Sequence, residues 1–430
     1  MRLTISSRPS CTLPSASKHL ENITASARPC CCTTSTRLPT QSYSPMESLH
    51  RIKHPTALSS LTCNPSLRLR KNWMEYQGLN NWEGLLDPLD DTLRKEILRY
   101  GQFVEAAYRS FDFDPSSPTY ANCKYPRNSL LNRCRIGETG YRMTKNLRAT
   151  CGIQLPSWFD RAPSWVSTRS SWIGYVAVCQ DKEEISRLGR RDVVIAYRGT
   201  ATCLEWLENL RATLTCLNED DDSNNVGVPM VERGFQSIYT SGTATCPSLR
   251  DMIREEISRV IQMYGDEPLS FTISGHSLGA ALATLTACDI NSTFPNAPMV
   301  TVISFGGPRV GNKSFRCQLD KSGTRILRIV NSDDLITKVP GFVAIDDEGG
   351  LPSWLPRRVE DTPWVYADVG RELRLSSKES PYLNKRDVAT CHELSTYLHL
   401  VNGFVSSTCP FRATAKKMLN KHHREKLGFR

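Results

Sequence analysis

The feature that most constrains the fold is a short motif in the middle of the chain, Gly275-His-Ser277-Leu-Gly279. Residues 271–273 before it are Phe-Thr-Ile, which is typical of a buried strand. Residues 280–290 after it are rich in Ala and Leu, which indicates a helix. A chain that passes from strand to helix within a few residues must turn sharply, and glycines allow a close approach because they lack a Cβ. The pattern therefore predicts a tight turn with Ser277 at its tip.

This order of strand, Gly-x-Ser-x-Gly and helix is that of the nucleophile elbow in α/β-hydrolases. It predicts that Ser277 is a nucleophile and that the backbone N–H of Leu278 is one donor of an oxyanion hole. His276 lies inside the elbow, where its side chain cannot turn back to Ser277 as a base. The pattern also occurs by chance in turns rich in Gly and Ser, but the flanking strand and helix favour the elbow.

Strand-like and helix-like segments alternate along the chain. Helical spacing and capping residues predict an N-terminal helical layer within residues 72–111 and a helix over residues 248–264. Apolar runs predict strands at residues 172–179, 192–197, 269–273, 300–305 and 325–330. This alternation predicts an α/β fold of the α/β-hydrolase type, with a mostly parallel central sheet and helices on both faces.

A serine nucleophile needs a base, and histidine is the usual one because its pKa lies near neutral pH. The chain has eight His, of which three lie near the N-terminus, two near the C-terminus and one in the elbow. His392 and His399 remain, and both follow the serine in the order found in α/β-hydrolases. We expect His392 to be the base, because it begins a helical stretch where a loop can orient it, and His399 to be a packing residue.

The acid should follow a strand between the serine and the histidine. Asp333 and Asp334 come directly after the strand expected at 325–330, and we choose Asp334 with Asp333 as the alternative. An Asn/Asp turn without chemistry explains the spacing nearly as well. Thr200, after the strand at 192–197, is a candidate for the second oxyanion donor. The alternative there is a simple strand-ending turn with Gly199 in a special conformation.

The net charge of +10 is concentrated at the two ends of the chain. Residues 1–71 hold ten Lys/Arg and two Glu, and residues 412–430 hold seven Lys/Arg and one Glu, which leaves a net charge of −4 on the body between them. A folded nucleic-acid-binding surface would carry its positive charge on the body. We therefore expect no nucleic-acid partner.

Composition also predicts a transit peptide and disordered leader at residues 1–71 and a basic tail at 412–430, which leaves residues 72–411 for the α/β-hydrolase domain. The leader is rich in Ser and Thr and poor in acids, and it lacks the apolar core of a secretory signal. It favours a chloroplast location. No apolar run is long enough for a transmembrane helix. The 16 Cys show no zinc-site spacing or disulfide framework, and we expect Cys134, Cys151 and Cys179 to pack as small apolar groups.

Several motifs together resemble the class 3 lipases, the fungal triacylglycerol lipase type, and within them the plant class I A1-type phospholipases of the anther-dehiscence-defective group. The resemblance runs from about Trp73 to Phe404. It rests on the elbow and on motifs at residues 81–90, 99–108, 198–206, 304–312, 328–334 and 392–399. In this family the motif around Arg328 places the acid at Asp334, and the first histidine of the last motif is the base.

The resemblance implies a serine acyl hydrolase that releases fatty acids from the sn-1 position of membrane glycerolipids, at the thylakoid or plastoglobule surface. The implied substrates are phosphatidylcholine, galactolipids and, in some members, triacylglycerol. It also implies a short lid after the oxyanion residue, with Leu204 and Trp206 on its apolar side. The chemistry calls for no metal or organic cofactor. The alternative is a lipase-like lipid-binding or signalling protein without turnover, which the presence of all three triad residues disfavours.

Overall fold

The structure is a computed structural model. It describes residues 65–114, 116–150, 170–200, 213–218, 227–340, 342–343, 365–380, 383 and 388–403. The chain divides into two units, residues 1–60 and 61–430, and all described residues belong to the second unit. The lid candidates Leu204 and Trp206, the basic tail and Cys151 lie outside the described residues.

A seven-stranded sheet forms the centre of this unit, in the order β1-β2-β3-β6-β7-β8-β11. The pairs β1/β2 and β2/β3 are antiparallel, and every other neighbouring pair in this sheet is parallel. Its strands are β1 Tyr141–Thr150, β2 Ser170–Cys179, β3 Arg191–Tyr197, β6 Leu269–His276, β7 Met299–Phe305, β8 Arg325–Asn331 and β11 Arg371–Leu375. The prediction of a mostly parallel α/β sheet is confirmed.

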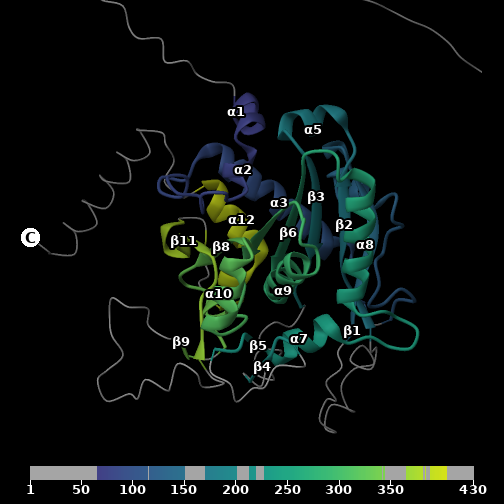
Figure 1. Ribbon diagram of the computed structural model, residues 1–430, viewed down its shortest axis with the longest axis vertical. Helices are drawn as coiled ribbons and strands as arrows, with labels where there is room; N and C mark the ends of the chain where they lie inside the picture. Colours follow the sequence, from purple (N-terminus) through teal and green to yellow (C-terminus); the bar gives the residue numbers. More distant parts are fainter. Residues whose placement is uncertain are drawn as a thin grey trace, which may run out of the picture. The chain divides into compact units, whose positions relative to one another are not determined.

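Helices cover both faces of the sheet (Figure 1). One face packs against α3 (Asp91–Ser110) and α12 (Leu394–Gly403), joined by α1 (Pro65–Lys71), α2 (Trp73–Tyr76) and α4 (Leu130–Arg133). The other packs against α7 (Arg233–Thr240), α8 (Leu249–Tyr264), α9 (Leu278–Thr293) and α10 (Lys313–Lys321). Two further short helices are α5 (Lys182–Leu188) and α11 (Val388–His392), and two small sheets pair β4 (Leu214–Cys216) with β5 (Met230–Glu232) and β9 (Phe342–Val343) with β10 (Val365–Tyr366).

Strand β3 shows why the central strands have continuous apolar sequences. Successive side chains of a strand point to opposite faces of the sheet. Val193 and Ile195 therefore join the core beneath α8 and α9, whereas Val194 and Ala196 join the core beneath α3. Because both faces are covered, residues 193–197 of the strand form a continuous apolar run, as expected for a parallel α/β sheet.

The folded unit begins earlier than the boundary expected at residue 71. Residues Pro65–Lys71 form helix α1, Leu69 is buried in the core beneath α3, and Arg68 pairs with Asp90 at 3.2 Å. The expectation of disorder up to residue 71 is therefore wrong for this last stretch. The polar composition before residue 72 gave no sign that Leu69 is buried, because this burial depends on tertiary packing.

The sheet brings three predicted site segments to one edge. The parallel strands β3, β6, β7 and β8 end close to one another. Tyr197 of β3 lies opposite Gly275 of β6, and Phe305 of β7 lies opposite His276 of β6 on one side and Ile329 of β8 on the other. The segments that follow these strands therefore emerge at the same carboxyl edge, which is where α/β sheets bind their ligands. No helix in the described part of the chain is both long and apolar enough to cross a membrane.

Candidate active site

The elbow has the geometry that its sequence predicts. Strand β6 ends at His276, helix α9 begins at Leu278, and Ser277 between them has φ 58° and ψ −127°. A positive φ is rare for a residue with a side chain and persists only where the surroundings enforce it. A Cβ at Gly275 would collide with the carbonyl of Gly279, so strand and helix approach more closely than any side chain would allow. The turn holds Ser277 at the carboxyl edge of the sheet.

The candidate acid and base are in direct contact. Asp334 follows β8, and its Oδ2 lies 2.7 Å from Nδ1 of His392 at the end of α11. The same oxygen accepts a hydrogen bond from the Tyr397 hydroxyl at 2.6 Å, and Oδ1 accepts one from the backbone N–H of Ile336 at 2.9 Å. The carboxylate is wholly inaccessible to solvent and its hydrogen bonds fix its orientation toward the imidazole.

The two alternative residues have other partners. Asp333 pairs with Lys378 at 3.1 Å and accepts a hydrogen bond from the Ser376 hydroxyl at 3.1 Å. His399 lies seven residues after His392 and contacts the Ser380 hydroxyl through its Nε2 at 3.0 Å. The structure thus brings Asp334 and His392 together and places Asp333 and His399 elsewhere.

The loop after β3, residues 198–200, carries the candidate oxyanion residue Thr200. Its hydroxyl oxygen is buried and has no hydrogen-bond partner among the residues that the structure describes. The Arg198 guanidinium donates to the carbonyl of Gly199 at 2.7 Å and stacks 3.5 Å above the ring of Phe111. Burial lowers the pKa of Arg198 to about 10, so this arginine remains charged at neutral pH.

Gly199 is needed for close approach and not for a left-handed backbone. It is absent from the glycines with positive φ, which argues against the alternative of a turn with Gly199 in a special conformation. A Cβ at this position would lie 2.8 Å from the carbonyl oxygen of His276 and 2.9 Å from Cβ of Ser277. The loop that carries Thr200 therefore packs directly against the elbow.

Comparison with known proteins identifies the family of this chain. Residues 194–344 match the family described as Lipase (class 3). The chain is also 66% identical over 367 residues to phospholipase A(1) DAD1, chloroplastic, of Arabidopsis thaliana, with 83% of this chain and 81% of that protein covered. The chain belongs to the class 3 lipase family. This confirms the resemblance drawn from the sequence motifs.

Two further relatives of this class 3 lipase bear related names. It is 39% identical to galactolipase DONGLE, chloroplastic, of Arabidopsis thaliana, over 78% of this chain and 71% of that protein. It is 41% identical to phospholipase A1 EG1, chloroplastic/mitochondrial, of Oryza sativa subsp. indica, over 77% of this chain and 74% of that protein. Among solved structures, the lipase from Rhizopus microsporus var. chinensis matches with a TM-score of 0.41 and 20% identity, covering 68% of this chain and 76% of that chain.

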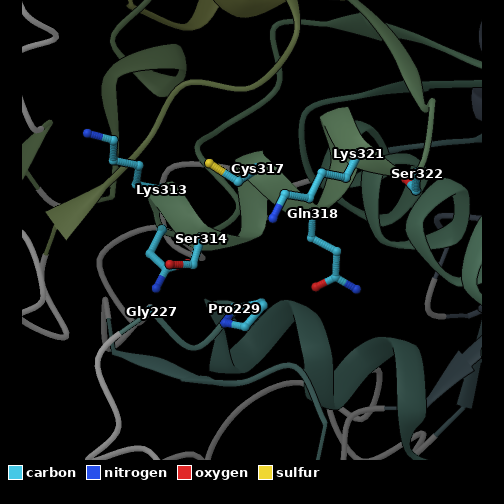
Figure 2. Close-up of a pocket in the computed structure, with 9 residues that line it drawn as sticks. Gly227, Pro229, Lys313, Ser314, Cys317, Gln318, Lys321 and Ser322 are labelled. Carbon is cyan, nitrogen blue, oxygen red and sulfur yellow. The ribbon is translucent and has the colours of Figure 1, made fainter.

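A cavity of about 690 Å³ lies at α10 of this lipase (Figure 2). Its lining includes Lys313, Cys317 and Lys321 but none of the candidate catalytic residues. Asn312, which also lines the cavity, has a structural role, because its side-chain oxygen accepts hydrogen bonds from the backbone N–H groups of Met230 and Phe315. Because none of the candidate catalytic residues lines the cavity, we place no reaction there. In the described ranges, no cluster of three His, Cys, Asp or Glu could hold a metal ion.

Sequence reasoning missed two residues that hold the candidate pair. Tyr397 contacts Asp334 as described above, and Asn331 donates from Nδ2 to the carbonyl of Cys391 at 2.9 Å, just before His392. Both lie within the motifs that carried the resemblance, at the end of β8 and five residues after His392. Their polar side chains among apolar neighbours were the available signal. The predicted packing role of Cys134 and Cys179 agrees with their burial as free thiols.

Proposed function

We propose that this class 3 lipase is a serine acyl hydrolase of the phospholipase A1 type, which releases fatty acids from the sn-1 position of glycerolipids in the chloroplast. The observation that carries the proposal is the position of Ser277 on its elbow at the same sheet edge as the bonded pair of Asp334 and His392. The names of the relatives support the substrate class and the chloroplast location. Phosphatidylcholine, galactolipid and triacylglycerol are the candidate substrates, reached at the thylakoid or plastoglobule surface.

The proposed reaction is acyl transfer in two steps. His392 takes the proton of the Ser277 hydroxyl as the oxygen attacks the ester carbonyl, and Asp334 stabilises the resulting imidazolium. The backbone N–H of Leu278, together with Thr200, stabilises the negative oxygen of the tetrahedral intermediate. His392 then protonates the departing lysolipid oxygen. In the second step the same histidine activates water, which releases the fatty acid and restores Ser277.

Thr200 suits the oxyanion role because its hydroxyl is buried and without a partner among the described residues. Such a group costs free energy in the resting protein, and a ligand oxygen would remove that cost. Leu278 suits it because the first N–H groups of a helix have no acceptor within the helix. Donors held in place before the reaction need no rearrangement when charge develops.

The test compares Ser277→Ala with Ser274→Ala in the full-length chain. Ser274 is a buried serine on the same strand, and its hydroxyl donates to the Ile303 carbonyl at 3.3 Å. We expect Ser277→Ala to lower hydrolysis by at least about 10⁴-fold and to abolish labelling by a fluorophosphonate, because the nucleophile is lost. Ser274→Ala should retain both. Near wild-type turnover by Ser277→Ala would overturn the mechanism.

The same protein incubated with lipids labelled separately at sn-1 and sn-2 tests the substrate. Phosphatidylcholine, monogalactosyldiacylglycerol and triacylglycerol are presented in vesicles or emulsions, and the products are identified by mass spectrometry. We expect labelled fatty acid from sn-1 and a lysolipid that keeps its sn-2 chain. Vesicle binding without hydrolysis or fluorophosphonate labelling would instead support the lipid-binding alternative.

A further inference from the structure

A line of hydrogen bonds runs from the candidate oxyanion loop to the candidate base through two residues that the proposed mechanism does not use. The N–H of Gly199 donates to the Tyr108 hydroxyl at 2.8 Å, and that oxygen lies 2.7 Å from Nδ1 of His276. Nε2 of His276 lies 2.7 Å from the backbone carbonyl oxygen of His392. We propose that Tyr108 and His276 are positioning residues that hold the oxyanion loop and the catalytic histidine in register. This inference rests on the proposed function.

The chemistry of the groups fixes the direction of each bond. A carbonyl oxygen can only accept, so Nε2 of His276 must carry a hydrogen and donate to His392. The pKa of His276 lies well below its usual range, because burial disfavours the imidazolium and His392 lies close by. The ring is therefore neutral, and its Nδ1 accepts the hydrogen of the Tyr108 hydroxyl. In this arrangement the Tyr108 hydroxyl accepts from Gly199 and donates to His276, and His276 donates to the carbonyl of His392.

At the oxyanion end, the line fixes the peptide group that precedes Thr200. Tyr108 holds the N–H of Gly199, and Arg198 holds its carbonyl oxygen. The carbonyl of Gly199 and the N–H of Thr200 belong to one planar peptide group. Anchoring that carbonyl and the neighbouring N–H sets the direction in which the N–H of Thr200 points. A donor is effective at about 2.7–3.1 Å from the developing oxyanion, and its position must be held to within about 0.5 Å.

At the other end, the line holds the last turn of α11. The final carbonyl groups of a helix have no partner within the helix. Here two successive ones are held by side chains, that of Cys391 by Asn331 and that of His392 by His276. The imidazole rings of His276 and His392 lie with centroids 4.7 Å apart. The elbow therefore carries both the nucleophile and the anchor for the backbone of the base.

Tyr108 comes from the last turns of α3, outside the residues 194–344 that match the family description. It belongs to the N-terminal motif at residues 99–108, for which the mechanism gives no role. Since three different segments meet at one hydroxyl and one imidazole, removal of the hydroxyl should loosen the site without opening the core.

The test is Tyr108→Phe in the full-length protein, with Tyr175→Phe as the matched control. Tyr175 is buried, whereas Tyr108 is partly buried. The Tyr175 hydroxyl donates to the carbonyl of Phe103 on the same helix at 2.9 Å, but it has no part in the line. We expect Tyr108→Phe to lower kcat about tenfold with KM within about twofold, because only the transition state uses the oxyanion donors. Tyr175→Phe should change kcat less than about twofold at a similar shift in Tm.

A double mutant separates positioning from loss of stability. If Tyr108 acts through the oxyanion loop, its effect on kcat should be less than additive with that of Thr200→Val and additive with that of Tyr175→Phe. Equal kcat values for Tyr108→Phe and Tyr175→Phe would overturn the inference, and so would full additivity of Tyr108→Phe with Thr200→Val. In either case an active wild-type protein would leave the proposed function intact. A wild type that hydrolyses no lipid, with Ser277 unlabelled, would overturn both.

Discussion

Adjacent carboxylates in this lipase differ in every contact that matters for catalysis. Asp334 is buried, receives hydrogen bonds from Tyr397 and Ile336, and faces His392. Asp333 is partly buried and pairs with the exposed Lys378. Consecutive residues in a turn point in different directions, so one position along the chain separates a candidate catalytic group from an ion pair outside the site. Residue identity alone left the two nearly equivalent.

Asp334→Asn should lower kcat about 10³–10⁴-fold, because the amide cannot hold the His392 imidazole in the required tautomer or stabilise its positive charge. Asp333→Asn serves as the control and should keep kcat within about twofold, since the partners of Asp333 are Lys378 and Ser376 and not His392. The measurement is the steady-state rate on phospholipid vesicles, with circular dichroism to verify the fold. Similar losses in both variants would contradict the assignment of the acid.

At the scale of elements, helix α7 begins at a buried carboxylate. Glu232, the last residue of β5, is almost inaccessible, and its side chain accepts a hydrogen bond from the N–H of Phe235 at 2.7 Å. Burial raises the pKa of Glu232 to about 7, although its hydrogen bonds with backbone N–H groups oppose the shift. Glu232 is the N-cap residue of α7, so the hydrogen bond at the start of this helix involves a carboxyl group that titrates near neutral pH.

Stability should depend on pH through Glu232. The folded protein holds this proton more tightly than the unfolded chain, whose carboxyl has the ordinary value of 4.5. The contribution to the free energy of unfolding is therefore complete below that value and is lost as pH rises through about 7. From pH 5 to pH 8 the wild type should lose about 2 kcal/mol more than Glu232→Gln, which keeps the accepting oxygen but cannot titrate.

Urea denaturation of both proteins at pH 5, 6.5 and 8 measures this difference. Relative to the Glu232→Gln curve, the wild-type curve of unfolding free energy should fall between about pH 4.5 and pH 7, and the two curves should run parallel above about pH 7. Parallel curves across the whole range would show that Glu232 titrates as an ordinary exposed carboxyl.

At the scale of the whole molecule, a buried ionic cluster joins the N-terminal helix layer to the sheet. Asp192 of β3 is inaccessible and lies 3.3 Å from Arg99 of α3 and 3.7 Å from Arg190. It also accepts hydrogen bonds from the hydroxyls of Tyr141 at 2.8 Å and Thr272 at 2.9 Å. Burial alone would raise the pKa of Asp192, but the two arginines lower it below its ordinary value. The carboxylate thus ties α3 to strands β1, β3 and β6.

Asp192→Ala should lower the free energy of unfolding by about 3–5 kcal/mol, because it removes the carboxylate that pairs with buried Arg190 and one of the two that pair with Arg99. Glu105→Ala provides the control on α3, since Glu105 forms an exposed pair with Arg109 and should cost less than about 1 kcal/mol. Chemical denaturation of both variants at neutral pH is the measurement. A loss below about 1 kcal/mol for Asp192→Ala would contradict this account of how the helix layer is held.

The strands at the two edges of the sheet could not be predicted from apolar sequence patterns. The central strands were predicted from their apolar residues. Residues 193–197 of β3 form a continuous apolar run, and β6 alternates apolar residues with Ser and Thr. Strands β1 and β11 were not predicted. Each lies at an edge of the sheet, and their sequences, YRMTKNLRAT and RELRL, carry charged residues that point to solvent. Edge strands tolerate such charges, which also protect them from pairing with other chains.

The sequence by itself determined the elbow, the α/β alternation, the candidate serine and, by elimination, the pair of histidines His392 and His399, because these depend on local backbone geometry and on residue chemistry. Only the tertiary structure decided which aspartate meets His392, that α1 is part of the fold, and that Tyr108, Asn331 and Tyr397 hold the site. Those contacts join residues far apart in the chain. Their distances depend on how strands pair and helices pack, which no local pattern of residues specifies.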